Sequence, residues 1–131
     1  MNRRSLLLAA AALSALPYAA MAETTDYTPG TAEAAIANGD TVFVDFAADW
    51  CSTCRSQERT IEALRAADPA YDAAITFYRV DWDTYGRGAF ATSLGVPRRS
   101  TLVMFRDGAE VARIVAGTAE ADIRALLDAG L

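Results

Sequence analysis

Hydrophobic residues along this chain fall into short blocks that alternate between two periodicities. Strand-like apolar runs, bounded by turn residues, occupy 41–47, 73–80, 101–105 and 110–116. Helix-like apolar spacing occupies 31–38, 52–67, 84–94 and 118–129. A further edge strand is expected within 26–28. The order βαβαβαββα predicts a three-layer α/β/α sandwich that ends in a hairpin and a helix.

Capping and turn residues set the expected boundaries. Thr31 and Thr118 are predicted to cap the helices that follow them. Asp68-Pro69 ends the longest helix, and two glycines weaken the helix expected over 84–94. Residues 106–108 form the hairpin turn.

The N-terminal segment resembles an export signal. Arg3-Arg4 precede a Leu/Ala-rich run over 5–16, and Ala20-Met21-Ala22 is typical of a signal-peptidase site. We expect cleavage after Ala22, a mature domain over 23–131 and a periplasmic location. An uncleaved anchor is the alternative, although the apolar run is short for a membrane span. The two arginines also leave the general secretory and twin-arginine routes open.

Composition excludes several classes of function. The chain has no histidine, which excludes Cys–His hydrolases, His-ligated zinc or copper sites and c-type haem attachment. The formal net charge is −5 from 12 basic and 17 acidic residues. Removing the two arginines of 1–22 changes the net charge to −7. This acidity argues against nucleic acid and anionic membrane surfaces as partners, and we expect no stable membrane insertion after cleavage.

Cys51 and Cys54 are the only two cysteines, and they follow a buried strand at the start of a helix. A disulfide between them closes so small a loop that it contributes little stability, which favours redox chemistry over a structural staple. Cys51 should cap the helix, where N–H groups lower the pKa of its thiol and make it the nucleophile. Cys54, one turn later and more buried, should resolve the mixed disulfide.

An acidic residue, Asp45, interrupts the buried strand before the cysteines. Burial should raise the pKa of this carboxyl group and make it a proton acceptor near neutral pH. The alternative is a structural ion pair.

Two tryptophans and two acids flank these segments. Trp50 is expected at the rim of the active site, as an aromatic contact for substrates, or in the core. Trp82 is expected to pack at a strand end. Asp81 and Asp83 lack calcium-loop spacing and are interpreted as loop or N-cap acids.

Residues 44–54 resemble the active-site segment of the thioredoxin family, and the likeness extends over nearly the whole mature chain. Residues 48–51 with Cys54-Arg55 are most similar to the C-terminal domain of the periplasmic reductant-relay protein DsbD. The turn at 106–108, Gly117 and the last helix match in order and spacing. The resemblance implies a thioredoxin fold with a mixed sheet, Asp45 beneath Cys54 and Arg79 partly offsetting the charge of Asp45.

One position departs from the family pattern. Thioredoxins place a cis-proline directly before the Thr that opens the next strand, and here Ser100 precedes Thr101. Either Pro97 is the cis residue with three residues looped out, or Ser100 lies opposite Cys51; strand register favours the second. Arg98 and Arg99 would then add positive charge beside Cys51 and favour an acidic partner, or else be solvated loop charges.

The sequence therefore predicts an exported thiol–disulfide oxidoreductase. Its expected substrate-binding residues are Trp50, Pro97, Ser100 and Thr101. We expect it to work as a monomeric protein-disulfide reductase, supplied by a membrane thiol donor, in a thiol relay or in cytochrome c maturation. The redox group is the Cys51–Cys54 disulfide, with no bound cofactor or metal.

Two alternatives use the same residues. The protein could act as a disulfide oxidase or isomerase. A Cu(I)-binding thiol module is less favoured, because Met104 is the only methionine left after cleavage.

Overall fold

The computed structural model describes residues 23–131, and the expected signal segment, 1–22, lies outside the described residues. The strands are β1 (Thr25–Asp26), β2 (Val42–Ala47), β3 (Thr76–Asp81), β4 (Thr101–Arg106) and β5 (Ala109–Val115). The helices are α1 (Thr31–Ala37), α2 (Ser52–Ala67), α3 (Pro69–Ala74), α4 (Trp82–Tyr85), α5 (Ala89–Ser93) and α6 (Glu120–Asp128).

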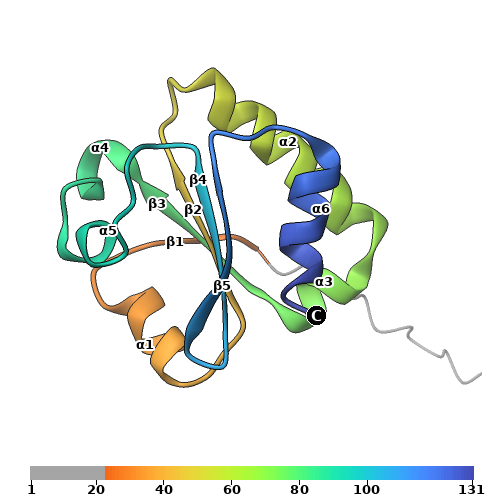
Figure 1. The fold of residues 1–131 in the computed structure, drawn as a ribbon, viewed down its shortest axis with the longest axis horizontal. Helices are drawn as coiled ribbons and strands as arrows, with labels where there is room; N and C mark the ends of the chain where they lie inside the picture. The colour runs from red at the N-terminus through yellow and green to blue at the C-terminus, as the bar shows by residue number, and fades with distance from the viewer. Residues whose placement is uncertain (1–22) are drawn as a thin grey trace, which may run out of the picture.

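The five strands form one mixed sheet in the order β1-β3-β2-β4-β5. β1 and β2 both run parallel to β3, whereas β4 is antiparallel to β2 and β5 is antiparallel to β4. Helices cover both faces of this sheet (Figure 1). The predicted three-layer α/β/α sandwich and the mixed sheet are confirmed.

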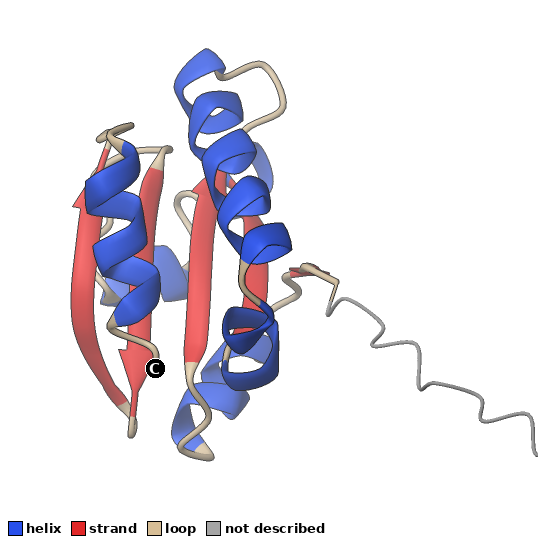
Figure 2. Ribbon diagram, turned by 90° about the vertical axis from the view of Figure 1, so that its right-hand side faces the viewer, coloured by secondary structure: helices blue, strands red, loops and turns tan. Residues whose placement is uncertain are grey.

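Each face of the sheet has its own hydrophobic core. α1, α4 and α5 cover the face that carries Val42, Val44 and Phe46 of β2. α2, α3 and α6 cover the opposite face, which carries Phe43, and α2 and α6 lie there side by side (Figure 2). Because side chains alternate along a strand, Asp45 points to the same face as Phe43, under α2.

Two predicted elements, one strand and one helix, were wrong in their extent. The strand expected from Ala73 begins at Thr76, because Asp68 caps the short helix α3 by accepting a hydrogen bond from Ala70 N (2.9 Å) and Pro69 opens it. The single helix expected over 84–94 is two, α4 and α5, separated at 86–88. Gly86 allows the close approach there, since a Cβ on it would lie 2.6 Å from the Trp82 carbonyl oxygen.

The predicted caps at Thr31 and Thr118 were also wrong. Gly30, at φ +92°, is the N-cap of α1, and the Thr31 hydroxyl instead donates to the Thr28 carbonyl (2.7 Å). Ala119 is the N-cap of α6, with no side-chain hydrogen bond. The edge strand expected around 26–28 is Thr25–Asp26; Tyr27 N still donates to the Arg79 carbonyl (2.8 Å), and the Tyr27 side chain packs into the core.

Candidate active site

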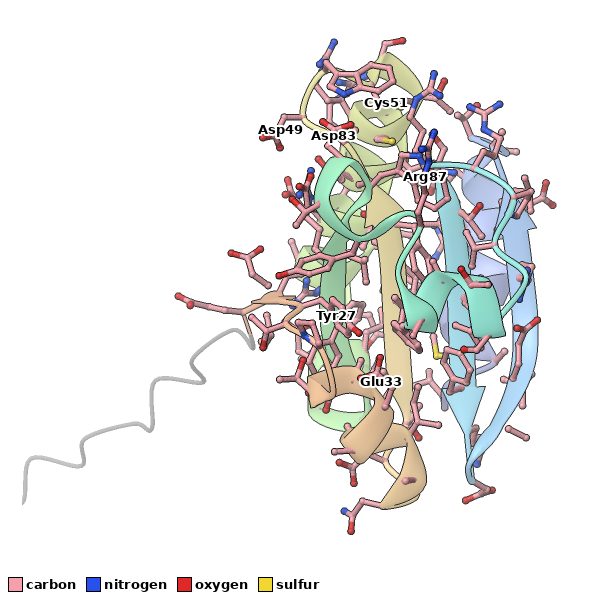
Figure 3. All side chains as sticks on the ribbon, turned by 90° about the vertical axis from the view of Figure 1, so that its left-hand side faces the viewer. Tyr27, Glu33, Asp49, Cys51, Asp83 and Arg87 are labelled. Carbon is pink, nitrogen blue, oxygen red and sulfur yellow. The ribbon has the colours of Figure 1, made fainter. Side chains whose placement is uncertain are left out.

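Cys51 lies at the N-terminus of α2 and caps it. Its Sγ accepts a hydrogen bond from the backbone N–H of Cys54 at 3.2 Å. This is the arrangement expected of Cys51 from the sequence, in which an unpaired helix N–H points at a sulfur. Both cysteines are buried free thiols, and Cys51 lies at one end of the molecule (Figure 3).

Ser100 lies opposite both cysteines. Its Oγ is 3.2 Å from Cys51 Sγ and 3.1 Å from Cys54 Sγ, so one hydroxyl bridges the two sulfurs. Of the two placements left open by the sequence, the structure has the one in which Ser100 faces Cys51. Residues 23–131 contain no cis peptide bond, and Pro97 is exposed in the loop before Ser100.

The pKa values of the two thiols are shifted in opposite directions. Burial of Cys51 opposes its ionisation, but hydrogen bonds from Cys54, Ser100 and Arg99 outweigh burial and lower the pKa of Cys51 to about 7. Burial raises the pKa of Cys54, and its hydrogen bond to Cys51 raises it further. Near neutral pH the dithiol therefore carries its charge on Cys51 and its proton on Cys54.

Asp45 is buried on β2, and its Oδ1 has no hydrogen-bond partner. Burial raises the pKa of Asp45 to about 8; Glu58 and Cys51 raise it further, and Arg79 opposes them. Asp45 also lines a cavity of about 160 Å³ together with Glu58 and Arg79. The carboxyl group thus holds its proton near neutral pH and senses the charge on Cys51.

Arg79 is the register partner of Asp45 in the neighbouring strand. Its guanidinium binds Asp49 (2.9 Å) and Glu58 (3.3 Å). The charge of Arg79 lowers the pKa of Asp45, as the resemblance implied, but most of its hydrogen bonding is committed elsewhere.

The rim beside Cys51 is built around Trp50, which is 56% exposed. The indole N–H donates to Asp83 (2.9 Å to Oδ2), and the Arg99 guanidinium stacks on the ring at 4.3 Å from its centroid. Trp50 is therefore a surface aromatic rather than a core residue. Figure 3 shows Asp49 and Asp83 on one side of Cys51 and Arg87 on the other.

The remaining predicted residues play structural parts here. Thr101 is buried at the start of β4, and its hydroxyl donates to the Arg98 carbonyl (2.7 Å). Trp82 packs edge-on against Phe46, as expected of a packing residue. Asp81 caps α4 by accepting from Thr84 N (3.2 Å), which confirms its interpretation as an N-cap.

Gln57 was missed by the sequence reasoning. It is fully buried on α2, and its Nε2 donates to the Ser100 carbonyl (3.0 Å) and the Gly117 carbonyl (2.9 Å). It therefore ties the loop that carries Ser100 to α2. The available signal was a glutamine one turn after Cys54, on the helix face that carries the core residues.

The described part of the chain offers no group of three or more His, Cys, Asp or Glu residues placed to hold a metal ion. Met104, the methionine considered for a Cu(I) site, packs in the core cluster under α2 and α6 and not in the cluster that contains the cysteines. No helix within residues 23–131 combines the length and apolar character needed to cross a membrane.

Comparison with known proteins gives a consistent picture. The family model for thioredoxin matches residues 23–129. Thioredoxin of Chlamydia muridarum is 40% identical over 74 residues, which cover 56% of this chain and 67% of that protein. Thioredoxin-1 of Saccharomyces cerevisiae is 36% identical over 83 residues, covering 63% and 75%.

Solved structures agree with these sequence relatives. The crystal structure of Trxlp from Edwardsiella tarda superposes with a TM-score of 0.67 at 33% identity, covering 81% of this chain and 96% of that one. A mutant thioredoxin from Halobacterium salinarum gives a TM-score of 0.64 at 31% identity, covering 86% and 91%.

Proposed function

The chain belongs to the thioredoxin family of thiol–disulfide oxidoreductases, and we propose that it is an exported member that works as a protein-disulfide reductase. Cys51 and Cys54 are its redox-active pair. The observation that carries the proposal is the unequal pair of thiols, with an acidic sulfur at the helix N-terminus and a protonated one behind it.

The reduction proceeds in two exchanges. The Cys51 thiolate attacks one sulfur of a client disulfide, which forms a mixed disulfide and releases the other client sulfur as a thiolate that takes up a proton. Cys54 then loses its proton and attacks Cys51 Sγ, which breaks the mixed disulfide and releases the second client thiol. Two electrons pass from the dithiol to the client, whose two sulfurs take up two protons; the loss of the Cys54 proton balances one and solvent supplies the other, and the Cys51–Cys54 disulfide remains.

Asp45 supports the second exchange in this proposal. Its carboxyl group lies on the α2 face of β2, is charge-coupled to Cys51 and has a pKa of about 8. The ionised fraction of this group is a base strong enough to accept the Cys54 proton, and that fraction grows as the pH approaches 8. The cavity that it shares with Glu58 and Arg79 would let the proton leave towards solvent.

The acidity of Cys51 supports reduction over oxidation. Strongly oxidising disulfides owe their potential to a very stable thiolate, with a thiol pKa of about 3.5. The pKa of Cys51 is lowered only to about 7, so its thiolate is less stabilised and its disulfide a weaker oxidant. If the protein is instead an oxidase, a measurement of the reduction potential of the Cys51–Cys54 couple would reveal it.

The proposal includes export to the periplasm and a source of electrons there. The n-region, apolar run and small-x-small site of residues 1–22 support cleavage after Ala22 and function in the periplasm. A protein there needs electrons from across the membrane, which supports a membrane thiol donor. The similarity of residues 48–55 to the DsbD C-terminal domain supports a place in a thiol relay or in cytochrome c maturation, with the protein acting as a monomer.

A disulfide-reduction assay tests this function. The mature chain, 23–131, should catalyse the reduction of insulin by dithiothreitol, and Cys51→Ser should abolish catalysis. Ser52→Ala, which changes the exposed residue next to Cys51, is the matched control and should retain activity. Failure of the unmodified chain to accelerate the reduction would refute the reductase assignment.

A further inference from the structure

The hydroxyl of Ser100 lies between the two reacting sulfurs, at 3.2 Å from Cys51 Sγ and 3.1 Å from Cys54 Sγ. A serine hydroxyl has one proton to donate and lone pairs with which to accept. We propose that Ser100 is a third catalytic residue, which donates to the Cys51 sulfur, accepts from the Cys54 thiol and thereby stabilises the reactive state with Cys51 ionised and Cys54 protonated. This inference rests on the dithiol chemistry proposed above.

The backbone holds this hydroxyl in place from three directions. Ser100 N donates to the Phe46 carbonyl (2.7 Å), and the Ser100 carbonyl accepts from Ala116 N (2.9 Å) and from Gln57 Nε2 (3.0 Å). The residue is fully buried and adopts φ +64°, a conformation that L-residues other than glycine seldom take. A group fixed this way needs little reorganisation when charge develops on the sulfur beside it.

Hydrogen-bond complementarity identifies the protonation state that Ser100 favours. With both thiols protonated, the hydroxyl meets two weak donors and no charged acceptor. With Cys51 ionised and Cys54 protonated, it donates to a thiolate and accepts from a thiol, so both of its functions are used. The Cys54 N–H at 3.2 Å from Cys51 Sγ places the charge on Cys51 rather than on Cys54.

This role has a redox consequence. The Cys51–Cys54 disulfide carries neither a thiolate nor an S–H group, so both interactions of the hydroxyl are weakened on oxidation. Ser100 therefore stabilises the dithiol relative to the disulfide. Removing the hydroxyl should make the dithiol a stronger reductant by roughly tenfold in its equilibrium with glutathione, or about 30 mV.

Two substitutions separate the hydroxyl from the loop geometry. Ser100→Ala and Ser100→Gly both remove the hydroxyl, but glycine also relieves the positive φ, so Ser100→Gly should be the more stable of the two. Both should shift the glutathione equilibrium by the same roughly tenfold factor and raise the midpoint pH of Cys51 alkylation by about one unit.

Two outcomes would overturn the inference: unchanged equilibrium and alkylation in both variants, or a change in only one of them. A change in one variant alone would make loop conformation the cause. Because each variant is compared with the unmodified chain, these results hold whichever direction the enzyme works in. Failure of the proposed reductase function would instead appear as a lack of insulin reduction by the unmodified chain.

Discussion

Asp45 and Arg79 are register partners on adjacent parallel strands, yet the ion pairs of Arg79 go to Asp49 and Glu58. Asp45 Oδ1 is left buried without a hydrogen-bond partner, and the pKa of the group rises to about 8. This environment favours the interpretation of Asp45 as a group that holds a proton over its interpretation as a member of a structural ion pair. The fold therefore keeps a costly acid beside its redox centre.

Asp45→Asn should stabilise the protein and flatten its pH dependence. Between about pH 4 and 8 the folded state holds a proton on Asp45 that the unfolded state has lost, so stability falls as pH rises, by at most about 1.4 kcal/mol per pH unit. Urea unfolding of the reduced protein at pH 5 and pH 8 should show this fall in the parent and much less of it in Asp45→Asn. Asp122→Asn, on an exposed part of α6, should keep the parent slope.

Cys51 should react with iodoacetamide before Cys54, with a rate that rises through a midpoint near pH 7. The sign for stability is opposite to that of Asp45. Because the pKa of Cys51 is lowered on folding, this thiol adds stability as pH rises from about 7 to 9. Mass spectrometry of the alkylated protein across pH 5 to 10 measures both the order and the midpoint, and first reaction at Cys54 would contradict the assignment.

Cys54→Ser should trap a mixed disulfide that Cys51→Ser cannot form. Without the resolving thiol, Cys51 still attacks a client disulfide but cannot release itself. Non-reducing electrophoresis with an oxidised client should show the adduct for Cys54→Ser alone. If Cys54→Ser also refolds a scrambled substrate as fast as the parent, the protein acts as an isomerase.

Gln57→Leu should destabilise the fold by about 1–3 kcal/mol, because it leaves the Gly117 carbonyl without its buried donor and weakens the hold on Ser100. The buried Gln57 Oε1, which has no partner of its own, limits the loss. Urea unfolding measures the change, and Glu62→Leu on the exposed side of α2 should leave stability within about 0.5 kcal/mol.

Arg99→Met should raise the midpoint pH of Cys51 alkylation by a few tenths of a unit and loosen Trp50, on which Arg99 stacks. It should also weaken the salt dependence of the reduction of an acidic client. Arg106→Met, at the exposed end of β4, is the matched loss of charge and should change neither property.

The sequence predicted the parts of this fold that depend on local pattern. The buried strand before Cys51, the long helix after it and the hairpin at Asp107-Gly108 all follow from apolar periodicity and turn residues. The cap at Thr31 was wrong because the left-handed Gly30 already makes the turn into α1. The break at 86–88 depends on the packing of Gly86 against Trp82, which no spacing rule contains.

The active site likewise contains residues that the sequence predicted and residues whose roles it did not predict. Cys51, Cys54 and Asp45 were identified because their residue types are unusual at those positions. The bridging position of Ser100 rests on long-range contacts with Phe46, Ala116 and Gln57, which come from three different segments. Gln57 carries no unusual composition or spacing, so its role became visible only in three dimensions.

The reduction potential of the Cys51–Cys54 couple tests the central claim most directly. Equilibration of the mature chain with glutathione buffers, followed by alkylation and mass spectrometry, measures it. A protein-disulfide reductase should give a value between about −200 and −270 mV. A value near −120 mV, that of a strong disulfide oxidant, would contradict the account.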